Sequence, residues 1–280
     1  MTIQWKSYGS MVGSWNMLIY GCSIFLMNKI SNDKASSHST LAFALYFTGL
    51  FNLMFNWGHH IYTLPTHAFI KHISYAISMT ELVILGRIIY NWKSSLSTAQ
   101  KHFHKQGYRF LVAADAWIFL NLFLAILMSV PAINIYTHGT HITVAHTMGT
   151  TIGINTMLLL AMCYDVLGDT CKSADTYKTM MKNGYWLANI SLFIFWLALI
   201  IAGILKAAWQ MSPTQVPFSS MMQQLRPFFI TFFIAGIMLT TGILMTIYPL
   251  VKNQLACYFK KTSSKKEKKT YRQAPTFAIE

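Results

Sequence analysis

The stretch that decides the fold is residues 136–166, which read YTHGTHITVAHTMGTTIGINTMLLLAMCYDV. From residue 142 onward the stretch has the apolar length of about 20 residues that a membrane-spanning helix needs. His138, His141 and His146 stand where this helix is predicted to begin. Histidine is costly inside a bilayer, and imidazole is a common ligand of metals and heme iron. The stretch therefore predicts a membrane helix with a metal or heme ligand near one end.

The rest of the chain also has the composition of a membrane protein. Hydrophobic residues make up 54% of the 280 residues and charged residues 11%, against about 25% charged residues in a soluble domain. We therefore expect an all-α integral membrane protein with a seven-helix transmembrane domain (residues 1–252) and a basic cytoplasmic tail (residues 253–280). The apolar windows of spanning length are residues 10–30, 38–58, 67–91, 109–131, 142–166, 184–208 and 227–251.

Lysine and arginine are distributed unevenly over the connections between these windows. They occur in the connections after the first, third and fifth windows and at the end of the chain, whereas the connections after the second and fourth windows contain none. Because positively charged loops stay in the cytoplasm, the N-terminus is predicted outside and the C-terminus inside. The formal net charge of +14 then indicates retention in the cytoplasm and attraction to anionic lipid. No nucleic-acid partner is expected.

This orientation brings five histidines to one membrane face. His59 and His60 end the second window, and His138, His141 and His146 lie at the start of the fifth. A single histidine at a membrane surface is more often an interfacial hydrogen bonder than a ligand. The five histidines gather in the two outer loops that lack lysine and arginine, and this favours a ligand role for His59, His60 and His146. Both interpretations stay open for His138 and His141.

At the beginning of the fifth window, two possible heme ligands and two glycines occupy defined faces of the predicted helix. On an α-helix His146 and Met148 point about 200° apart, and both residue types serve as axial heme ligands. Met148 is a candidate cofactor-binding residue, although a buried methionine is the simpler interpretation. Gly149 and Gly153 share one face, which permits close approach of either a neighbouring helix or a flat macrocycle.

Two carboxyl groups fall inside apolar windows. Glu81 lies midway along the third window and Asp115 in the inner part of the fourth. Each must be neutral or paired, because an isolated charge in hydrocarbon costs several kcal/mol. Arg87 is the predicted partner of Asp115. Glu81 has no obvious cation nearby in the sequence, which predicts a protonated group suited either to carrying protons or to donating a hydrogen bond near a polar site.

Other kinds of site find little support. The four cysteines show no short paired spacing, so neither a disulfide framework nor a thiolate zinc site is indicated. The phosphate-loop, G-x-S-x-G and H-E-x-x-H motifs do not occur. A Cys-x-x-Cys-His heme attachment is also absent, so a heme would be held through an axial ligand and its pocket alone.

Several of these residues together resemble a known family. Gly58-His59-His60, Glu81, the stretch Tyr136-Thr-His-Gly-Thr140 and the pair Ala145-His146 resemble the large subunit of bacterial nitric oxide reductases, in the heme-copper oxidase superfamily. The resemblance covers nearly the whole chain, but only the last seven of the family's twelve helices. It implies the C-terminal part of that subunit I-like fold, in a bacterial inner membrane, with partner chains that supply the missing helices and the electrons.

The resemblance also implies a role for each matching residue. His59 and His60 match two ligands of the non-heme metal, which is iron or copper. His146 matches the proximal ligand of one high-spin heme b. Glu81 matches a catalytic glutamate linked to proton supply.

The sequence departs from the family at the other ligands. Tyr8 and Val12 stand where the third metal histidine and a glutamate are expected, and Asn16 replaces a second glutamate. Tyr8 is then either a ligand of ferric iron or an interfacial tyrosine. Met148 stands where the family has the histidine that binds the low-spin heme, so this chain alone is not expected to hold that heme.

Three functions are compatible with this pattern. The first is a redox subunit that takes part with partner chains in respiratory electron transfer and in reducing NO or O2. The second is a catalytically degenerate relative with a structural, assembly or gas-sensing role. The third is a transporter or channel whose histidines are incidental. The sequence alone leaves open whether the chain is an enzyme.

Overall fold

A computed structural model describes residues 17–34, 37–55, 64–97, 105–170, 177–213 and 216–272, together with the single positions 6, 10, 14, 15, 58 and 62. Within these ranges, the side chains of residues 52, 53, 78, 79, 81, 82, 168–170 and 260–272 are not described. The described part is almost entirely helical and contains no strand.

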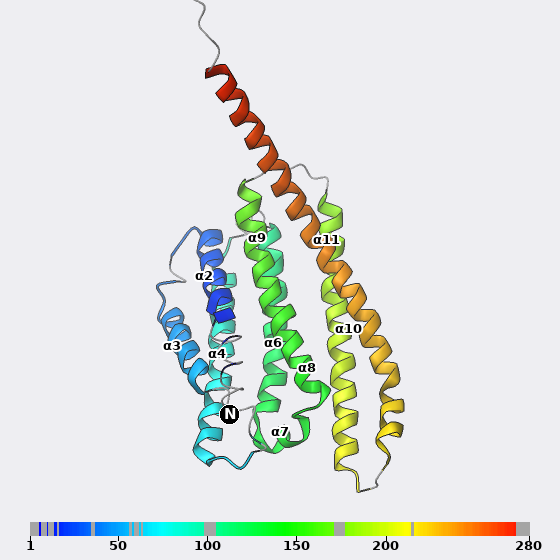
Figure 1. Cartoon of the computed structure of the whole chain (residues 1–280). Helices are drawn as coiled ribbons and strands as arrows, with labels where there is room; N and C mark the ends of the chain where they lie inside the picture. The colour runs from blue at the N-terminus through cyan, green and yellow to red at the C-terminus, as the bar shows by residue number, and fades with distance from the viewer. Residues whose placement is uncertain are drawn as a thin grey trace, which may run out of the picture.

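The long helices lie side by side and run alternately up and down the molecule (Figure 1). As a result, the C-terminal ends of α2, α4, α9 and α11 come to the same end of the bundle. The elements in chain order are α2 (Met17–Ser31), α3 (Thr40–Phe55), α4 (Ala68–Ser95), α6 (Lys105–Ser129), α7 (Pro131–Thr137), α8 (His141–Met148), η3 (Gly149–Thr156), α9 (Met157–Thr170), α10 (Lys178–Met211) and α11 (Phe218–Arg272).

The helices have the length and composition of membrane spans. Within the described residues, four helical segments are long and apolar enough to cross a bilayer: Lys105–Ser129, His141–Leu167, Lys178–Met211 and Phe218–Phe259. Two shorter apolar helices, Met17–Ser31 and Thr40–Phe51, lie beside them. Each of the seven predicted windows falls largely on a helix. The predicted class, a helical membrane protein, is confirmed, and the number of seven spans stays a prediction.

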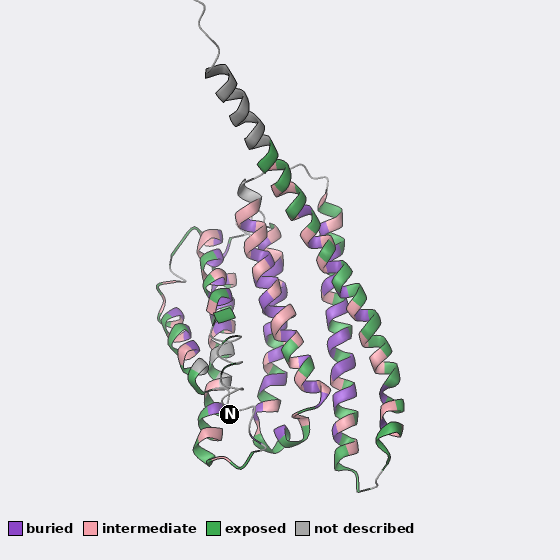
Figure 2. Ribbon diagram, in the orientation of Figure 1, coloured by how far each residue is buried: buried purple, intermediate pink, exposed green. Residues whose placement is uncertain are grey.

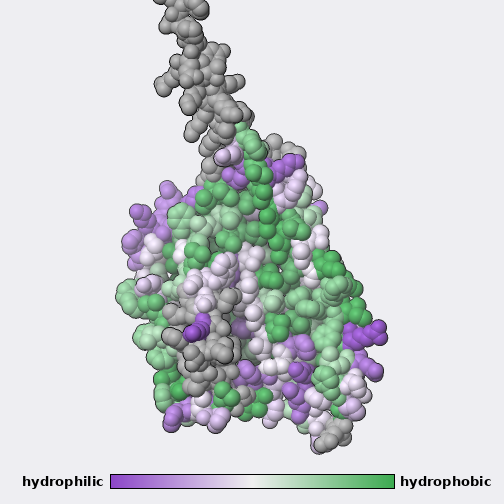
Figure 3. All heavy atoms as spheres, viewed as in Figure 1, coloured by the Kyte–Doolittle hydropathy of each residue, from purple (hydrophilic) through white to green (hydrophobic). Residues whose placement is uncertain are grey.

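Burial divides each helix into an inner and an outer face. Phe110, Leu111 and Ile118 of α6 are almost fully buried, in one core cluster with residues of α2, α4, α8, α9 and α10. Large apolar side chains such as Phe119 and Phe233 are more than 60% exposed on the outside. Figure 2 shows the buried residues along the inner faces, and Figure 3 shows large apolar patches on the side of the bundle in view. Such a surface suits hydrocarbon.

Small residues let α10 and α11 approach closely. A Cβ atom built on Gly184 would lie 2.7 Å from Met245 Cβ and 2.8 Å from the carbonyl oxygen of Gly242. A Cβ on Gly242 would lie 2.5 Å from the backbone nitrogen of Ala188. Close backbone packing on glycine and alanine is the usual way in which membrane helices associate.

The fifth predicted window is one continuous helical segment whose middle part is a π-helix. It begins as α8, widens into the π-helical η3 and ends as α9. Thr156 donates a side-chain hydrogen bond to the carbonyl of Thr151 at 2.9 Å, across five positions. The η3 sequence, GTTIGINT, is rich in glycine and β-branched residues, which disfavour a regular α-helix. π-helical turns are rare and often lie at functional sites.

Helix α11 is far longer than a bilayer is thick. Its 55 residues span about 80 Å at 1.5 Å per residue, against a hydrocarbon core of about 30 Å. The helix continues through the predicted boundary at residues 252 and 253, and its end stands clear of the bundle in Figure 1. The division into a membrane domain and a basic tail stays a prediction. Cys257 on this helix is disulfide-bonded, which cysteine spacing did not predict, whereas Cys22 and Cys163 are free thiols.

Candidate cofactor site

The predicted Tyr-Thr-His-Gly-Thr motif forms the turn that leads into α8. Helix α7 ends at Thr137, and Gly139 adopts a positive φ of 71°, which glycine tolerates best. Thr140 caps α8, because its hydroxyl accepts a hydrogen bond from the amide of Ile142 at 3.3 Å and donates one to the carbonyl of Thr137 at 2.6 Å. The motif therefore fixes where the helix of His146 begins.

The first turn of α8 is held against α10 and α11. A Cβ on Gly203 of α10 would lie 2.6 Å from the backbone nitrogen of Ile142, and Lys206 donates a hydrogen bond to the carbonyl of Gly139 at 2.9 Å. The ring of His141 lies 5.0 Å from that of Phe229 on α11. His141 thus has an aromatic contact, and His138 is half-buried in the turn.

His146 is the sixth residue of α8, about 7.5 Å along the helix from its start. Its side chain is half-buried, with the Nδ1 atom enclosed. Its backbone carbonyl accepts a hydrogen bond from the hydroxyl of Thr150 at 3.1 Å. That hydroxyl accepts one from the side-chain amide of Asn121 at 2.5 Å. A fully buried residue of α6 therefore helps to hold the backbone that carries His146.

Side chains of α6 occupy the glycine face of the fifth window. A Cβ on Gly149 would lie 2.5 Å from Asn121 Oδ1, and one on Gly153 would lie 2.5 Å from the indole ring of Trp117. The indole Nε1 of Trp117 donates a hydrogen bond to Asn189 Oδ1 at 3.1 Å. Of the two alternatives that the sequence left open, the structure shows the contact between helices at Gly149 and Gly153.

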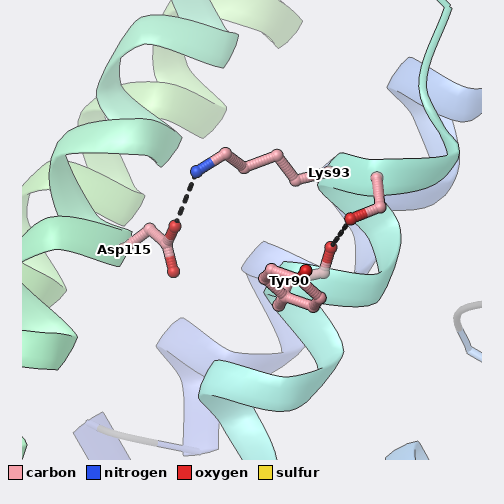
Figure 4. A network of polar contacts seen from close by, with 4 residues as sticks. Tyr90, Lys93 and Asp115 are labelled. Atoms are coloured by element: carbon pink, nitrogen blue, oxygen red, sulfur yellow. Dashed lines mark hydrogen bonds and ion pairs between the residues drawn. The ribbon is translucent and has the colours of Figure 1, made fainter.

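The ion pair at Asp115 differs from the predicted one. Lys93 Nζ lies 3.1 Å from Asp115 Oδ2 (Figure 4), so the prediction of Arg87 as the partner is wrong. Arg87 precedes Lys93 by six positions and lies about 120° away around α4, where it is exposed. A second pair, between Lys29 of α2 and Asp165 of α9 at 3.0 Å, joins helices at the same end of the bundle. Both aspartates are buried, and both pairs tie neighbouring helices together.

The predicted metal ligands His59 and His60 lie outside the described residues, as do Tyr8, Val12 and Asn16. Glu81 falls within α4, but its side chain is not among those described. In the part of the chain that the structure describes, no group of three or more His, Cys, Asp and Glu residues is placed to hold a metal ion.

Two residues next to the predicted His-His pair are described. Gly58 is buried and packs against Ser74 and Ile70 of α4. Tyr62 is also buried, and burial raises the pKa of its hydroxyl to about 12. The connection after α3 thus packs closely against the start of α4.

The donors present fit a heme held by one axial ligand. His146 offers a half-buried imidazole on a helix whose backbone is fixed from α6. Met148 is partly buried and packs against the hydrophobic core, in agreement with the simpler interpretation of that residue. Because residues 146 and 148 diverge around the helix, they do not suit the same side of one macrocycle.

Sequence inspection missed the polar residues that support this region. Asn121 and Asn189 lie inside the apolar windows 109–131 and 184–208. A buried amide in a membrane helix needs hydrogen-bond partners, so each was a detectable signal. The partner of Asn121, Thr150, and the partner of Asn189, Trp117, could not be read from the sequence.

Comparison with known proteins identifies the family of this chain. A family model described as cytochrome c and quinol oxidase polypeptide I matches residues 1–238. A nitric oxide reductase subunit from Stutzerimonas stutzeri is 20% identical over 245 residues, which cover 84% of this chain and 52% of that protein. The chain thus spans about half the length of the curated relative that it matches. It belongs to the cytochrome c and quinol oxidase polypeptide I family, the subunit I family of the heme-copper oxidases.

Proposed function

We propose that this chain is a heme-binding membrane subunit of the nitric oxide reductase and heme-copper oxidase type, which takes part in respiratory electron transfer and the reduction of NO or O2. The position of His146 carries the proposal. It follows the capping turn at Thr140, and its backbone is held by Thr150 and Asn121. The family match over residues 1–238 supports the same function.

In this proposal His146 is the axial ligand of one high-spin heme b. Such a heme, when bound, would supply redox chemistry toward a diatomic gas, with electrons delivered by the partner subunits. The protein contributes a ligand on a fixed backbone and an apolar surround that limits water. Met148 remains a second candidate for contact with the cofactor, with core packing as its simpler role.

We assign the two adjacent histidines, His59 and His60, to a non-heme iron or copper ion beside the heme. Imidazole is a suitable ligand for either metal. Glu81 is assigned to the supply of protons, because its neighbours in the sequence include no obvious cation and an unpaired intramembrane carboxyl is neutral and able to donate. These three assignments rest on the sequence and the family resemblance.

The proposal also includes partners and orientation. Other membrane subunits would supply the missing helices and the electrons, in keeping with the relative's name as one subunit of a reductase. The chain would lie in a bacterial inner membrane with its N-terminus outside and its C-terminus in the cytoplasm. The basic end of α11 would then contact anionic lipid.

A visible spectrum of the purified full-length protein, reduced with and without carbon monoxide, tests the heme assignment. We expect a Soret band that carbon monoxide shifts. His146→Ala should remove the heme, and the matched variant His141→Ala should keep it, because the His141 ring rests on Phe229. A His146→Ala protein with normal heme content would show that the ligand assignment is wrong.

Metal analysis tests the second centre. We expect about one non-heme iron or copper per heme, and His59→Ala and His60→Ala should each lose that metal while keeping the heme. Full metal content in both variants would contradict the assignment of the pair.

The alternative is a catalytically degenerate relative with a structural, assembly or gas-sensing role. The departures at Tyr8, Val12 and Met148 favour it, because they remove ligands that turnover in the family uses. Heme without a non-heme metal, together with no consumption of NO or O2, would support this alternative over the first function.

A further inference from the structure

Helix α4 carries an exposed cation on its outer face. Leu85, Ile88 and Trp92 are buried, whereas Val83, Arg87 and Tyr90 are exposed, with 50% exposure for Val83 and 55% for Tyr90. Among the described residues, Arg87 has no ion pair and no side-chain hydrogen bond. The nearby Lys93 is neutralised by Asp115. Within the described part of the chain, the C-terminal turns of α4 therefore present one uncompensated positive charge on their outer face.

The depth of Arg87 places this charge near a membrane surface. Tyr90 and Trp92 follow it by about one turn, and Lys93 comes next. Aromatic residues and lysine gather at the level of lipid headgroups. Arg87 precedes Tyr90 by about 4.5 Å of helix, a distance that the long arginine side chain can cover by extending toward the surface.

Along this face an apolar residue lies deeper in the membrane and polar residues lie nearer its surface, as the acyl chain and the headgroup of a phospholipid do. Val83 lies deeper than Arg87, while Tyr90, Asn91 and Ser94 lie nearer the end of the helix, and all are exposed. Ser94 donates its hydroxyl to the carbonyl of Tyr90 at 2.9 Å (Figure 4). Tyr90 and Asn91 carry side-chain donors, and Val83 offers contact to an acyl chain.

We propose that Arg87, Tyr90 and Asn91 bind the phosphate group of an anionic membrane phospholipid, whose acyl chain lies along Val83. The guanidinium group forms charge-assisted hydrogen bonds to phosphate oxygens. The phenol and the amide extend the set of donors toward the surface. This site is separate from the basic end of α11 and does not depend on heme.

Native mass spectrometry of the full-length protein, titrated with phosphatidylglycerol, tests the site. We expect Arg87→Leu and Arg87→Gln to weaken binding of the tightest lipid roughly fivefold, the effect of losing one cation near a membrane surface. Arg87→Lys should retain most of the binding. Arg226→Leu is the matched control, because Arg226 is also exposed but lies on the first part of α11, at the opposite end of the bundle (Figure 1).

All variants keep the basic tail, so differences between the Arg87 variants and the unchanged protein report on α4. Unchanged lipid binding in a folded Arg87→Leu or Arg87→Gln protein would overturn the proposal. An equal loss in Arg226→Leu would also overturn it, since the effect would then be one of overall charge. Displacement of the lipid by millimolar inorganic phosphate would point to a free phosphate as the ligand instead. Equally tight binding of phosphatidylcholine would contradict the preference for anionic lipid.

Discussion

The side-chain amide of Asn121 in α6 lies 2.5 Å from the hydroxyl of Thr150 in η3, and this hydroxyl donates to the carbonyl of His146. Asn121 is fully buried. Two helices that are distant in sequence are thus joined by a polar contact at the turn that follows the proposed heme ligand. A buried hydrogen bond of this kind restricts the backbone because no water replaces a lost partner.

Replacing Asn121 with alanine is expected to loosen this turn. The change leaves the Thr150 hydroxyl without its buried donor and should lower the free energy of unfolding by about 1–3 kcal/mol. If His146 binds heme, the Soret band of Asn121→Ala should also broaden or shift. Chemical denaturation and visible spectra measure the two effects. Asn183→Ala, at an exposed position of α10, is the matched control and should change neither.

Adding one methyl group at Gly153 should disturb the contact between α6 and η3. The new Cβ would lie 2.5 Å from the Trp117 ring, and such overpacking destabilises by about 1–3 kcal/mol. Gly21→Ala is the control, because no atom lies within 4 Å of its added Cβ. Thermal unfolding of the two variants compares them. Equal melting temperatures would mean that the glycine face is not closely packed.

Lys93 should matter more to stability than Arg87. Replacing Lys93 with methionine leaves Asp115 buried without its cation and is expected to cost about 1–3 kcal/mol, less than for a fully buried pair because the Lys93 side chain is 40% exposed. Replacing Asp115 with leucine in the same protein should restore most of the loss, because the uncompensated carboxyl is gone. Unfolding measurements on the single and double variants report the coupling. A larger loss in Arg87→Met than in Lys93→Met would contradict the observed pairing.

Glu81→Gln tests the proposed route for protons. If the chain supports turnover, the amide cannot carry a proton, so the rate of any reaction that consumes protons should fall while heme content stays constant. Stopped-flow consumption of NO or O2 measures the rate, and the spectrum measures the heme. An unchanged rate would leave Glu81 with a structural role only.

The predicted orientation has a direct test in the cell. A fluorescent protein fused to the C-terminus should be active, and alkaline phosphatase at the same position inactive, because the former folds in the cytoplasm and the latter outside. The bond at Cys257 is expected to be reduced in that compartment, so a maleimide should label this thiol after permeabilisation. Active phosphatase and an unlabelled thiol would reverse the orientation.

Apolar length alone was enough to predict the positions of the long helices, because each window of about 20 residues had to become a helix in hydrocarbon. The turn before α8 was not predicted, although it could have been, since a glycine and a capping threonine act locally. The partner of Asp115 could not be predicted, because Arg87 and Lys93 lie on the same helix and only the rotation of that helix decides which of them faces α6. The role of Asn121 was missed for a similar reason, since its partner lies 29 positions away.

The widened turn of η3 also affects how the fifth span packs. Buried residues recur at every fourth position along it, and in a uniform α-helix a strict spacing of four drifts around the axis by about 40° per step. Over five steps such a stripe of residues would turn roughly halfway around the helix axis, so its last residues would no longer contact α6. A π turn takes more residues than an α turn and rotates the chain back. In this span the fourfold repeat of buried positions therefore goes together with the π-helical turn of η3. The residues in this stripe are Ala145, Gly149, Gly153, Met157, Ala161 and Asp165.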